Sequence, residues 1–450
     1  MPRSAHRACD DFRQSSQDVR RRFAPAPLTR RQVIAGGLGA TLSVYAAKTM
    51  PFARLLEAAE AQAAAAPSAP VLVSVFLPGG CDLLDTLVPV SQYGRYADLR
   101  KAGRIAEPLS LGSSGLGLHP ALASGAGGGI KGLFDAGKIG FLPGIDYGNP
   151  DLSHFHSRHF WETGLITEQD APGWLGRWLD RHGADENPLQ GLSAGYSLSP
   201  VLRSSKAPVA AVDSPGSAQF YFRGVWGEPE KAALAAWRAI SAVDPPGDGP
   251  TAAWRGARLA QQVGDRLAPY AERDGKDPLA PPVPYPADND FGERLSRLAA
   301  LISKPLGVRV ATVEADGDFD THDNQPSELA RSLKTVSEAL AAFQADLEAR
   351  GVADRVLTVV WSEFGRRPEA NESQGTDHGA GGIGWVQGTR AASGVLTDYP
   401  SLTALDREDN LAVTVDFRKV YASLLEGWLG TPADEIIPRA GAFGRLALVR

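Results

Sequence analysis

The stretch VLVSVFLPGGCD, residues 71–82, indicates the class of the fold. Its first half is a continuous apolar run rich in β-branched side chains, which is the pattern of a strand buried on both faces of a parallel sheet. Two glycines follow and allow the backbone to turn sharply. Asp82 then comes directly after the strand, and α/β proteins bind ligands where the carboxyl ends of their strands meet. By itself, Asp82 reads equally well as a ligand or as an acidic turn residue.

Three other apolar runs, residues 139–143, 308–313 and 356–361, predict further strands. Between the last two, apolar residues recur at spacings of four and three, which predicts an amphipathic helix. These residues are Leu329, Leu333, Val336, Leu340, Phe343 and Leu347. Ser327 is the expected N-cap of this helix, and Gly351 is its expected C-terminal cap. Strand, helix and strand in this order form a right-handed βαβ unit, so the sequence predicts an α/β fold with a mostly parallel sheet.

The pattern along the rest of the chain predicts one α/β domain that covers residues 67–450. Residues 188–304 predict an insertion, in which residues 191–222, rich in Ser, Pro and Gly, suggest loops and small strands, and residues 228–304 predict helices. Residues 416–425 predict an amphipathic helix that ends before Gly430. A chain of 450 residues, 43% of them hydrophobic, is long enough to bury one large core.

Composition excludes some classes of function. The formal net charge of -6, without a basic stripe interleaved with aromatic residues, argues against binding to nucleic acid. Only two cysteines occur, so the chain has no disulfide framework. One of them, Cys81, is expected to be buried or close to a metal.

Residues 1–66 predict a twin-arginine export signal and a linker. Arg30 and Arg31 precede a mildly apolar run, and small-residue cleavage candidates follow it. A membrane anchor is the alternative, but the run of about 13 residues is shorter than the roughly 20 that cross a bilayer. The sequence therefore predicts a periplasmic or secreted protein without a stable membrane span. The twin-arginine translocase is its expected partner during export.

The stretch SHFHSRH, residues 153–159, holds three of the eight histidines. On a helix capped by Ser153, His156 and His159 share a face, whereas His154 points roughly 160° away from His156, so the three cannot bind one ion. Ser153 or His154 at the helix N-terminus is placed to meet an anion such as phosphate or sulfate. Ser153 is then a candidate nucleophile that a metal activates. A simple N-cap is the alternative role of Ser153.

Acidic and histidine side chains follow several of the predicted strands. Asp320 and His322 follow the strand at 308–313, and Asp377 and His378 lie between glycines in GTDHGAGG. An Asp and a His this close in a loop can ligate one divalent cation. Glu363 stands just past the strand at 356–361, where a salt bridge with the arginines after it competes with a ligand role. Together these residues predict a metal site at the edge of the sheet.

Several long motifs resemble a bacterial family of exported proteins, domain of unknown function 1501, whose fold is related to the alkaline phosphatase and sulfatase superfamily. The matching stretches include LVSVFLPGGCDLLDTLVP, SHFHSRHFWETG, DFDTHDNQ, RVLTVVWSEFGRRPEAN, GTDHG and DFRKVYASLLEGWLG. They run from about residue 70 to the C-terminus. The resemblance implies a three-layer α/β sandwich of the alkaline phosphatase type with a mostly parallel central sheet.

The resemblance also implies roles for single residues. A metal-binding Asp after the first strand matches Asp82, and a nucleophile at a helix start matches Ser153 or His154. An Asp and His pair matches Asp320 and His322. The chain is thus expected to carry most of the superfamily's metal ligands.

One position departs from that pattern. The last metal-binding His matches His378, but the usual Asp-His pair of an earlier strand falls on Glu363 and Phe364. Because a phenyl ring cannot ligate a metal, either Asp377 substitutes for the missing ligand or one of two metal positions is lost.

Two functions compete at this point. The first is an exported metal-dependent hydrolase of a small phosphate or sulfate ester, with one or two divalent ions and with Arg158 or Arg366 holding the anion in a bidentate manner. Oxygen and imidazole ligands together favour Zn or Mn over Mg. The second is a non-catalytic exported binding or scaffold protein with a degenerate site, which Phe364 favours.

Overall fold

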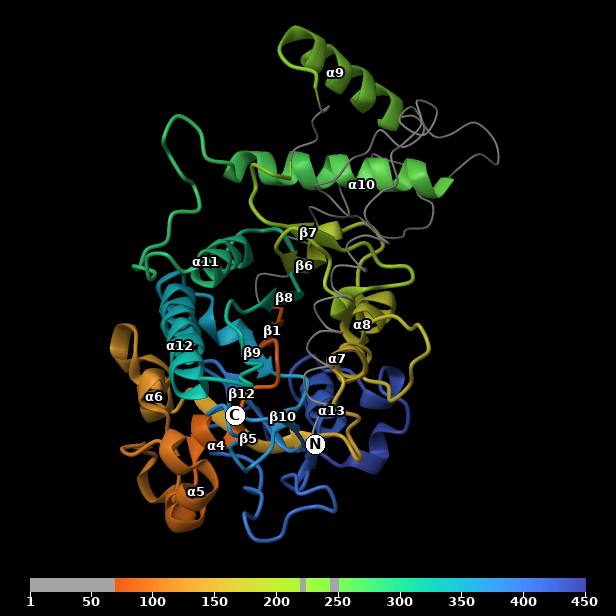
Figure 1. The fold of residues 1–450 in the computed structure, drawn as a ribbon. Helices are drawn as coiled ribbons and strands as arrows, with labels where there is room; N and C mark the ends of the chain where they lie inside the picture. Colours follow the sequence, from red (N-terminus) through yellow and green to blue (C-terminus); the bar gives the residue numbers. More distant parts are fainter. Residues whose placement is uncertain (1–68, 219–223, 243–250) are drawn as a thin grey trace. The chain divides into compact units, whose positions relative to one another are not determined.

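The computed structural model describes residues 69–218, 224–242 and 251–450 (Figure 1). The chain divides into two compact units: residues 1–40 with 221–240, and residues 41–220 with 241–450. The described part of the first unit is mainly helix α9 (Glu228–Ala242), which continues past its boundary. The predicted export signal lies outside the described residues. Among the described helices, none combines the length and the apolar character needed to cross a membrane.

The second unit is built on a nine-stranded sheet. Its order is β13 (Gly394–Val395), β5 (Ile139–Asp146), β12 (Gly382–Gln387), β9 (Val356–Trp361), β1 (Val71–Phe76), β8 (Val310–Glu314), β6 (Gly191–Ala194) and β7 (Ala210–Val212), and β14 (Val415–Asp416) also pairs with β5. Neighbouring strands are parallel except at β12, which runs antiparallel to both β5 and β9. The predicted mostly parallel central sheet is therefore confirmed.

Helices cover both faces of the sheet, which gives three layers (Figure 1). Side chains of β1 alternate between two cores, because successive residues of a strand point to opposite faces. Val73 packs in the core with helices α11 (Asp290–Ile302) and α12 (Gln325–Ala349). Leu72 packs in the other core, with helices α7 (His154–Thr163), α8 (Trp174–His182) and α13 (Phe417–Gly427).

Smaller elements complete the second unit. They are the helices α4 (Leu83–Thr86), α5 (Tyr93–Arg100), α6 (Gly129–Asp135) and α10 (Thr251–Leu267), a sheet of β2 (Leu87–Val88), β4 (Gly117–Leu118) and β3 (Leu109–Ser110), and the pair β10 (Gly365–Arg366) with β11 (His378–Gly379). Helix α13 confirms the helix predicted at 416–425, with Asp416 as its N-cap.

The helix of the predicted βαβ unit is α12, and it starts earlier than expected. Its N-cap is Asn324, and Pro326 occupies the first turn, where a missing N–H costs no hydrogen bond. Ser327 is therefore inside the helix, and its predicted role as N-cap is wrong. Gly351 follows the helix with a φ of 70°, as expected of a residue that ends one. Strands β8 and β9 are both parallel to β1, which lies between them.

The central sheet is larger than the sequence predicted. The small strands expected within the predicted insertion at 188–304 are β6 and β7, and they extend the central sheet through parallel pairing of β6 with β8. Strand β12 was not predicted, because its glycines hide the apolar pattern. A Cβ atom at Gly384 would lie 2.8 Å from the carbonyl oxygen of Val360 on β9, so the close approach of the two strands requires glycine there.

Candidate metal centre

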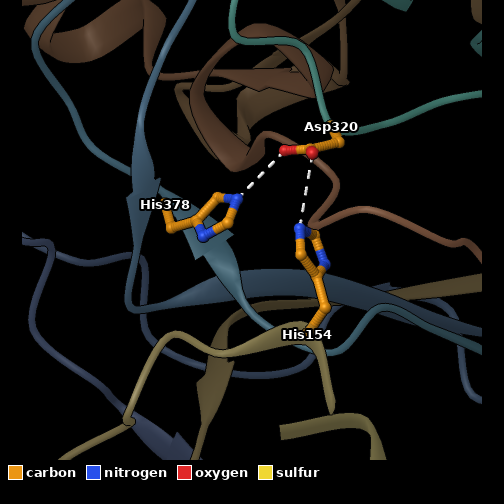
Figure 2. A group of neighbouring side chains, drawn as sticks. All are labelled: His154, Asp320 and His378. Atoms are coloured by element: carbon orange, nitrogen blue, oxygen red, sulfur yellow. Dashed lines mark hydrogen bonds and ion pairs between the residues drawn. The ribbon is translucent and has the colours of Figure 1, made fainter. Parts of the chain in front are cut away.

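The candidate site lies beyond the carboxyl ends of β1, β8 and β9. These ends lie at the same edge of the sheet because the three strands are parallel neighbours. Asp320 is in the loop after β8, His154 is the first residue of α7, and His378 begins β11. Figure 2 shows these three side chains converging from separate elements. One donor atom from each lies within 4.8 Å of the other two, so this group could hold a metal ion.

A fourth side chain, His322, joins the group. Its Nε2 lies 3.0 Å from Oδ1 of Asp320 and 3.0 Å from Nε2 of His378, which is itself 3.0 Å from the same carboxylate oxygen. Nε2 of His154 lies 3.4 Å from Oδ2 of Asp320. Neighbouring donors around a tetrahedral zinc ion with bonds of about 2.0–2.1 Å are about 3.3 Å apart. The donors of Asp320, His322 and His378, which are 3.0 Å apart, come close to this spacing, so they could share one divalent cation.

Each imidazole is held in place through its other ring nitrogen, Nδ1. The acceptors are the Glu363 carboxylate for His154 (2.8 Å), the Asp377 carboxylate for His322 (3.3 Å) and the Leu152 carbonyl for His378 (3.0 Å). An oxygen that accepts a hydrogen bond from Nδ1–H keeps the proton of a neutral imidazole on Nδ1. The lone pair of Nε2 is then available for a cation. All three histidines are thus oriented as metal ligands are.

A residue with a left-handed backbone supplies one of these acceptors. Leu152 has a φ of 58°, a conformation that costs a residue other than glycine about 1 kcal/mol or more. The backbone there places the Leu152 carbonyl against Nδ1 of His378. Strain of this kind gathers at functional sites, and the type of residue at 152 gives no sign of it.

Charges within the group favour an ionised Asp320. Burial raises the pKa of Asp320, but its contacts with three histidines and the charge of Arg366 hold that pKa well below its ordinary value. Burial, together with the charges of Arg366 and His154, lowers the pKa of His378 despite the nearby Asp320. Burial also acts to lower the pKa of His154, but hydrogen bonds to Asp320 and Glu363 raise it to about 9. A cation would therefore bind in competition with a proton on His154.

Glu363 and Asp377, predicted as direct ligands, take supporting positions. The buried carboxylate of Glu363 accepts hydrogen bonds from the backbone N–H groups of Gly79 (2.9 Å) and Gly80 (3.1 Å) as well as from His154. Burial raises the pKa of Glu363, but the hydrogen bond and charge of His154 outweigh it and lower that pKa. With its oxygens engaged in this way, Glu363 orients a ligand, and Asp377 does the same for His322.

Phe364 closes one side of the group. Its ring is fully buried, with its centroid 4.8 Å from that of His154 and 4.6 Å from that of His378. Gly80 is needed beside it, because a Cβ atom there would lie 2.4 Å from the Phe364 ring. The position at which the family pattern expects a His is thus filled by an apolar ring that packs on two of the ligands.

Arg366, predicted as an anion clamp, is buried and ties the loops of the site together. Its Nη2 donates to the carboxylate of Asp320 and to the carbonyl oxygen of Phe319, and Nη2 also contacts the carbonyl oxygen of Gly79. Nε and Nη1 donate to the carbonyl oxygens of Gly80 and Thr376 at 2.9 Å. Because the guanidinium donors contact backbone carbonyl oxygens and the Asp320 carboxylate, Arg366 holds Asp320 in position.

Asp82 differs most from its predicted role. Its buried carboxylate forms an ion pair with Arg100, 2.7 Å away, and caps α4 by accepting a hydrogen bond from the N–H of Asp85. Gln325 donates a further hydrogen bond to it at 3.1 Å. The structure therefore places Asp82 in a buried network with Arg100 and Gln325, which agrees with the alternative reading of Asp82 as a structural residue after β1.

The residues predicted to act on a substrate have structural partners. Ser153 caps α7 by accepting a hydrogen bond from the N–H of His156. Arg158 donates to Glu162 and Glu314, each at 2.8 Å. His154, predicted at the anion site, lies in the group that could hold a metal ion. The sequence did carry a signal for this, because the predicted helical angle separates His154 from His156 and His159.

Cys81 is fully buried, as predicted. Its sulfur lies 3.6 Å from the hydroxyl of Thr86. Burial raises the pKa of its thiol to about 12, so the thiolate required of a metal ligand or nucleophile is disfavoured.

Comparison with known proteins gives a family and several distant likenesses of structure. Residues 234–416 match the family described as "Protein of unknown function (DUF1501)", which confirms over that range the family predicted from the motifs. No curated protein matches the chain. PsFucS1 sulfatase from Pseudoalteromonas sp. is 12% identical with a TM-score of 0.35, over 89% of this chain and 78% of the sulfatase. Alkaline phosphatase from the Antarctic bacterium TAB5 is 9% identical with a TM-score of 0.30, over 71% of this chain and 91% of the phosphatase.

Proposed function

We propose that the protein is a metal-dependent hydrolase that binds one divalent cation and acts on a phosphate or sulfate ester. The orientation of three imidazoles carries the proposal, since every Nδ1 faces an acceptor of the chain and every Nε2 faces Asp320. Carboxylate and imidazole donors favour Zn²⁺ or Mn²⁺ over Mg²⁺. The chemistry that such a cation supplies when bound is Lewis-acid polarisation of an ester oxygen.

The surroundings of the group support a single ion. Phe364 packs on two of the imidazoles, Glu363 is engaged by backbone N–H groups, and Arg366 donates to Asp320. The two further carboxylates beside the group, Glu363 and Asp377, each face Nδ1 of an imidazole, so neither is assigned to a second cation. The expected stoichiometry is therefore one ion per chain.

Ser153 is the candidate nucleophile. It directly precedes His154 at the start of α7, where the free N–H groups of the helix favour an anionic ester. Since Ser153 also caps the helix, its replacement must separate the two roles. Ser153→Asn keeps a side chain that caps well, whereas Ser153→Ala loses about 1 kcal/mol of stability with the cap.

Metal analysis of the purified protein tests the first part of the proposal. The wild type should carry one Zn or Mn per chain, and His378→Ala and His322→Ala should lose most of it. His156→Ala is the matched control, because this exposed histidine of α7 faces Asp151 instead of the site. A wild type without metal after purification and after incubation with Zn²⁺ or Mn²⁺ would contradict the proposal.

Turnover of an aryl phosphate and an aryl sulfate tests the second part. We expect the metal-loaded wild type to hydrolyse one of them and His378→Ala to be inactive. If Ser153 is the nucleophile, Ser153→Asn binds metal normally and loses turnover. Undiminished turnover in Ser153→Asn would exclude that role and leave water as the nucleophile.

A metal-binding protein without hydrolytic activity is the second candidate. It is favoured by the partners of Ser153 and Arg158, which serve as a helix cap and in ion pairs in the structure. Full metal occupancy without turnover of either ester would select this function.

We also propose export through the twin-arginine pathway to the periplasm or beyond, on the basis of Arg30 and Arg31 ahead of an apolar run. Replacing both arginines by lysine keeps the charge and should retain the protein in the cytoplasm. Fractionation of cells that express each form measures this, and equal export of both would refute the pathway.

A further inference from the structure

Gln325, the first residue of α12, joins two loops that carry candidate ligands. Its side chain is buried, and its Oε1 accepts hydrogen bonds from the hydroxyls of Thr321 (2.8 Å) and Thr376 (2.6 Å). Thr321 stands between Asp320 and His322 in the sequence, and Thr376 precedes Asp377 and His378. One amide oxygen therefore connects both Asp and His pairs of the site.

The backbone brings the same two loops together. The N–H of Thr376 donates to the carbonyl oxygen of Thr321 at 3.0 Å, and the N–H of Gln325 donates to that of Gln374 at 3.0 Å. These hydrogen bonds set the loops side by side but leave their threonine side chains unconstrained. The amide oxygen of Gln325 fixes those side chains and so fixes the distance between the two ligand pairs.

The other end of the amide is anchored in the buried network around Asp82. Nε2 of Gln325 donates to Asp82 at 3.1 Å and to Asp85 at 2.7 Å. Both carboxylates are themselves held by Arg100, at 2.7 Å for Asp82 and 3.5 Å for Asp85. Because two carboxylates can only accept from an uncharged amide, Nε2 must face them and Oε1 must face the threonines. The orientation of the amide is thereby determined.

We propose that Gln325 is a positioning residue of the metal centre, which transmits the rigidity of the buried Asp82–Asp85–Arg100 network to the ligands Asp320, His322 and His378. This inference rests on the proposed metal-binding function. Supporting groups behind metal ligands typically contribute about 10- to 100-fold to metal affinity. Gln325 acts indirectly, because it contacts the hydroxyls of Thr321 and Thr376, which are next to the candidate ligands in the sequence.

Metal titration of variants tests the proposal. Gln325→Met keeps the length of the side chain but loses all four hydrogen bonds, so Zn²⁺ should bind about 10- to 100-fold more weakly. Gln344→Met is the matched control, because Gln344 is buried on the same helix and donates to Glu348 and Thr389 instead. We expect a comparable loss of thermal stability in the control, with zinc affinity within twofold of the wild type.

The threonines provide a rescue test. Thr376→Val removes the hydroxyl at nearly constant volume and should weaken zinc binding, whereas Thr376→Ser keeps the hydroxyl and should bind as the wild type does. Wild-type zinc affinity in both Gln325→Met and Thr376→Val would overturn the role of Gln325 while leaving the metal centre itself intact.

A metal-free measurement separates this inference from the proposed function. At one fixed pH, the imidazole resonances of His322 and His378 should shift or broaden in Gln325→Met but not in Gln344→Met. If the wild type binds no divalent cation, the proposed function fails, and these resonances alone decide the role of Gln325. Unchanged resonances would then overturn it.

Discussion

Nδ1 of His154 lies 2.8 Å from Oε1 of Glu363, although 209 residues separate the two in the sequence. Glu363 also accepts hydrogen bonds from the N–H groups of Gly79 and Gly80 in the loop after β1 and from the hydroxyl of Ser362. This carboxylate therefore links three segments of the chain and fixes the ring of one candidate ligand. Glu363, which the sequence predicts as a metal ligand, orients the candidate ligand His154 instead.

Glu363→Gln should weaken metal binding by about 10- to 100-fold. Both carboxylate oxygens of Glu363 accept hydrogen bonds, whereas the amide of glutamine has only one acceptor oxygen, so either His154 or the glycine N–H groups lose their acceptor. The buried N–H groups that lose an acceptor should cost about 1–3 kcal/mol of stability. Isothermal titration with Zn²⁺ and urea unfolding measure the two effects.

Glu162→Gln is the control for that experiment. Glu162 is also buried, but it pairs with Arg158 outside the metal group. Its replacement should lower stability and leave zinc affinity unchanged. Equal zinc affinities for Glu363→Gln and the wild type would show that the His154–Glu363 contact is only structural.

Phe364→Ala should reduce stability by about 3–5 kcal/mol, as expected for a large aromatic side chain removed from a buried site. It should also weaken metal binding, since the rings of His154 and His378 lose the surface on which they pack. Phe343→Ala, at a fully buried position of α12, should cost similar stability without a change in metal affinity. Urea unfolding combined with zinc titration distinguishes the two, and identical metal affinities would contradict the role given to Phe364.

Asp82→Asn separates a ligand from a structural carboxylate. Because it leaves the buried Arg100 without its closest partner, we expect a loss of about 3–5 kcal/mol in the free energy of unfolding. The number of metal ions per folded chain should stay at one, whereas loss of a ligand would lower it. Glu369→Gln, which breaks an exposed pair with Lys101, should cost less than about 1 kcal/mol. Elemental analysis and chemical denaturation give the two quantities.

His119 should make stability depend on pH. Burial lowers its pKa to about 4 from an ordinary 6.5, only partly opposed by the charge of Asp82. With the folded-state pKa depressed, the unfolded chain binds the extra proton, so stability is complete above pH 6.5 and is lost as the pH falls through 4. The loss from this group should approach about 3 kcal/mol, at about 1.4 kcal/mol per pH unit.

Denaturation at several pH values tests this dependence. His119 also caps a short 3₁₀ helix by accepting from the N–H of Ala121 at 3.0 Å. His119→Asn keeps a capping side chain and should remove the contribution of about 3 kcal/mol between pH 6.5 and 4, whereas His182→Asn should retain it. The same pH profile in His119→Asn and the wild type would refute the assignment.

The sequence alone determined four buried strands of the sheet and the edge at which the candidate site lies. Runs such as residues 71–77 and 356–361 specify buried strands because apolar, β-branched composition is a local property. Asp320, His322 and His378 were predicted as candidate ligands from local features too, since they stand in loops after strands or between glycines. The strand β12 escaped prediction, because the glycines that let it approach β9 remove its apolar signal.

The tertiary structure alone decided which charged side chains face the cation site and which support it. Asp82, Glu363 and Asp377 are the same kinds of residue as Asp320, and composition cannot tell them apart. Their roles follow from partners far away in the sequence: Arg100 for Asp82, His154 for Glu363 and His322 for Asp377. The choice between Nδ1 and Nε2 on each imidazole depends on such partners, and these exist only once the chain has folded.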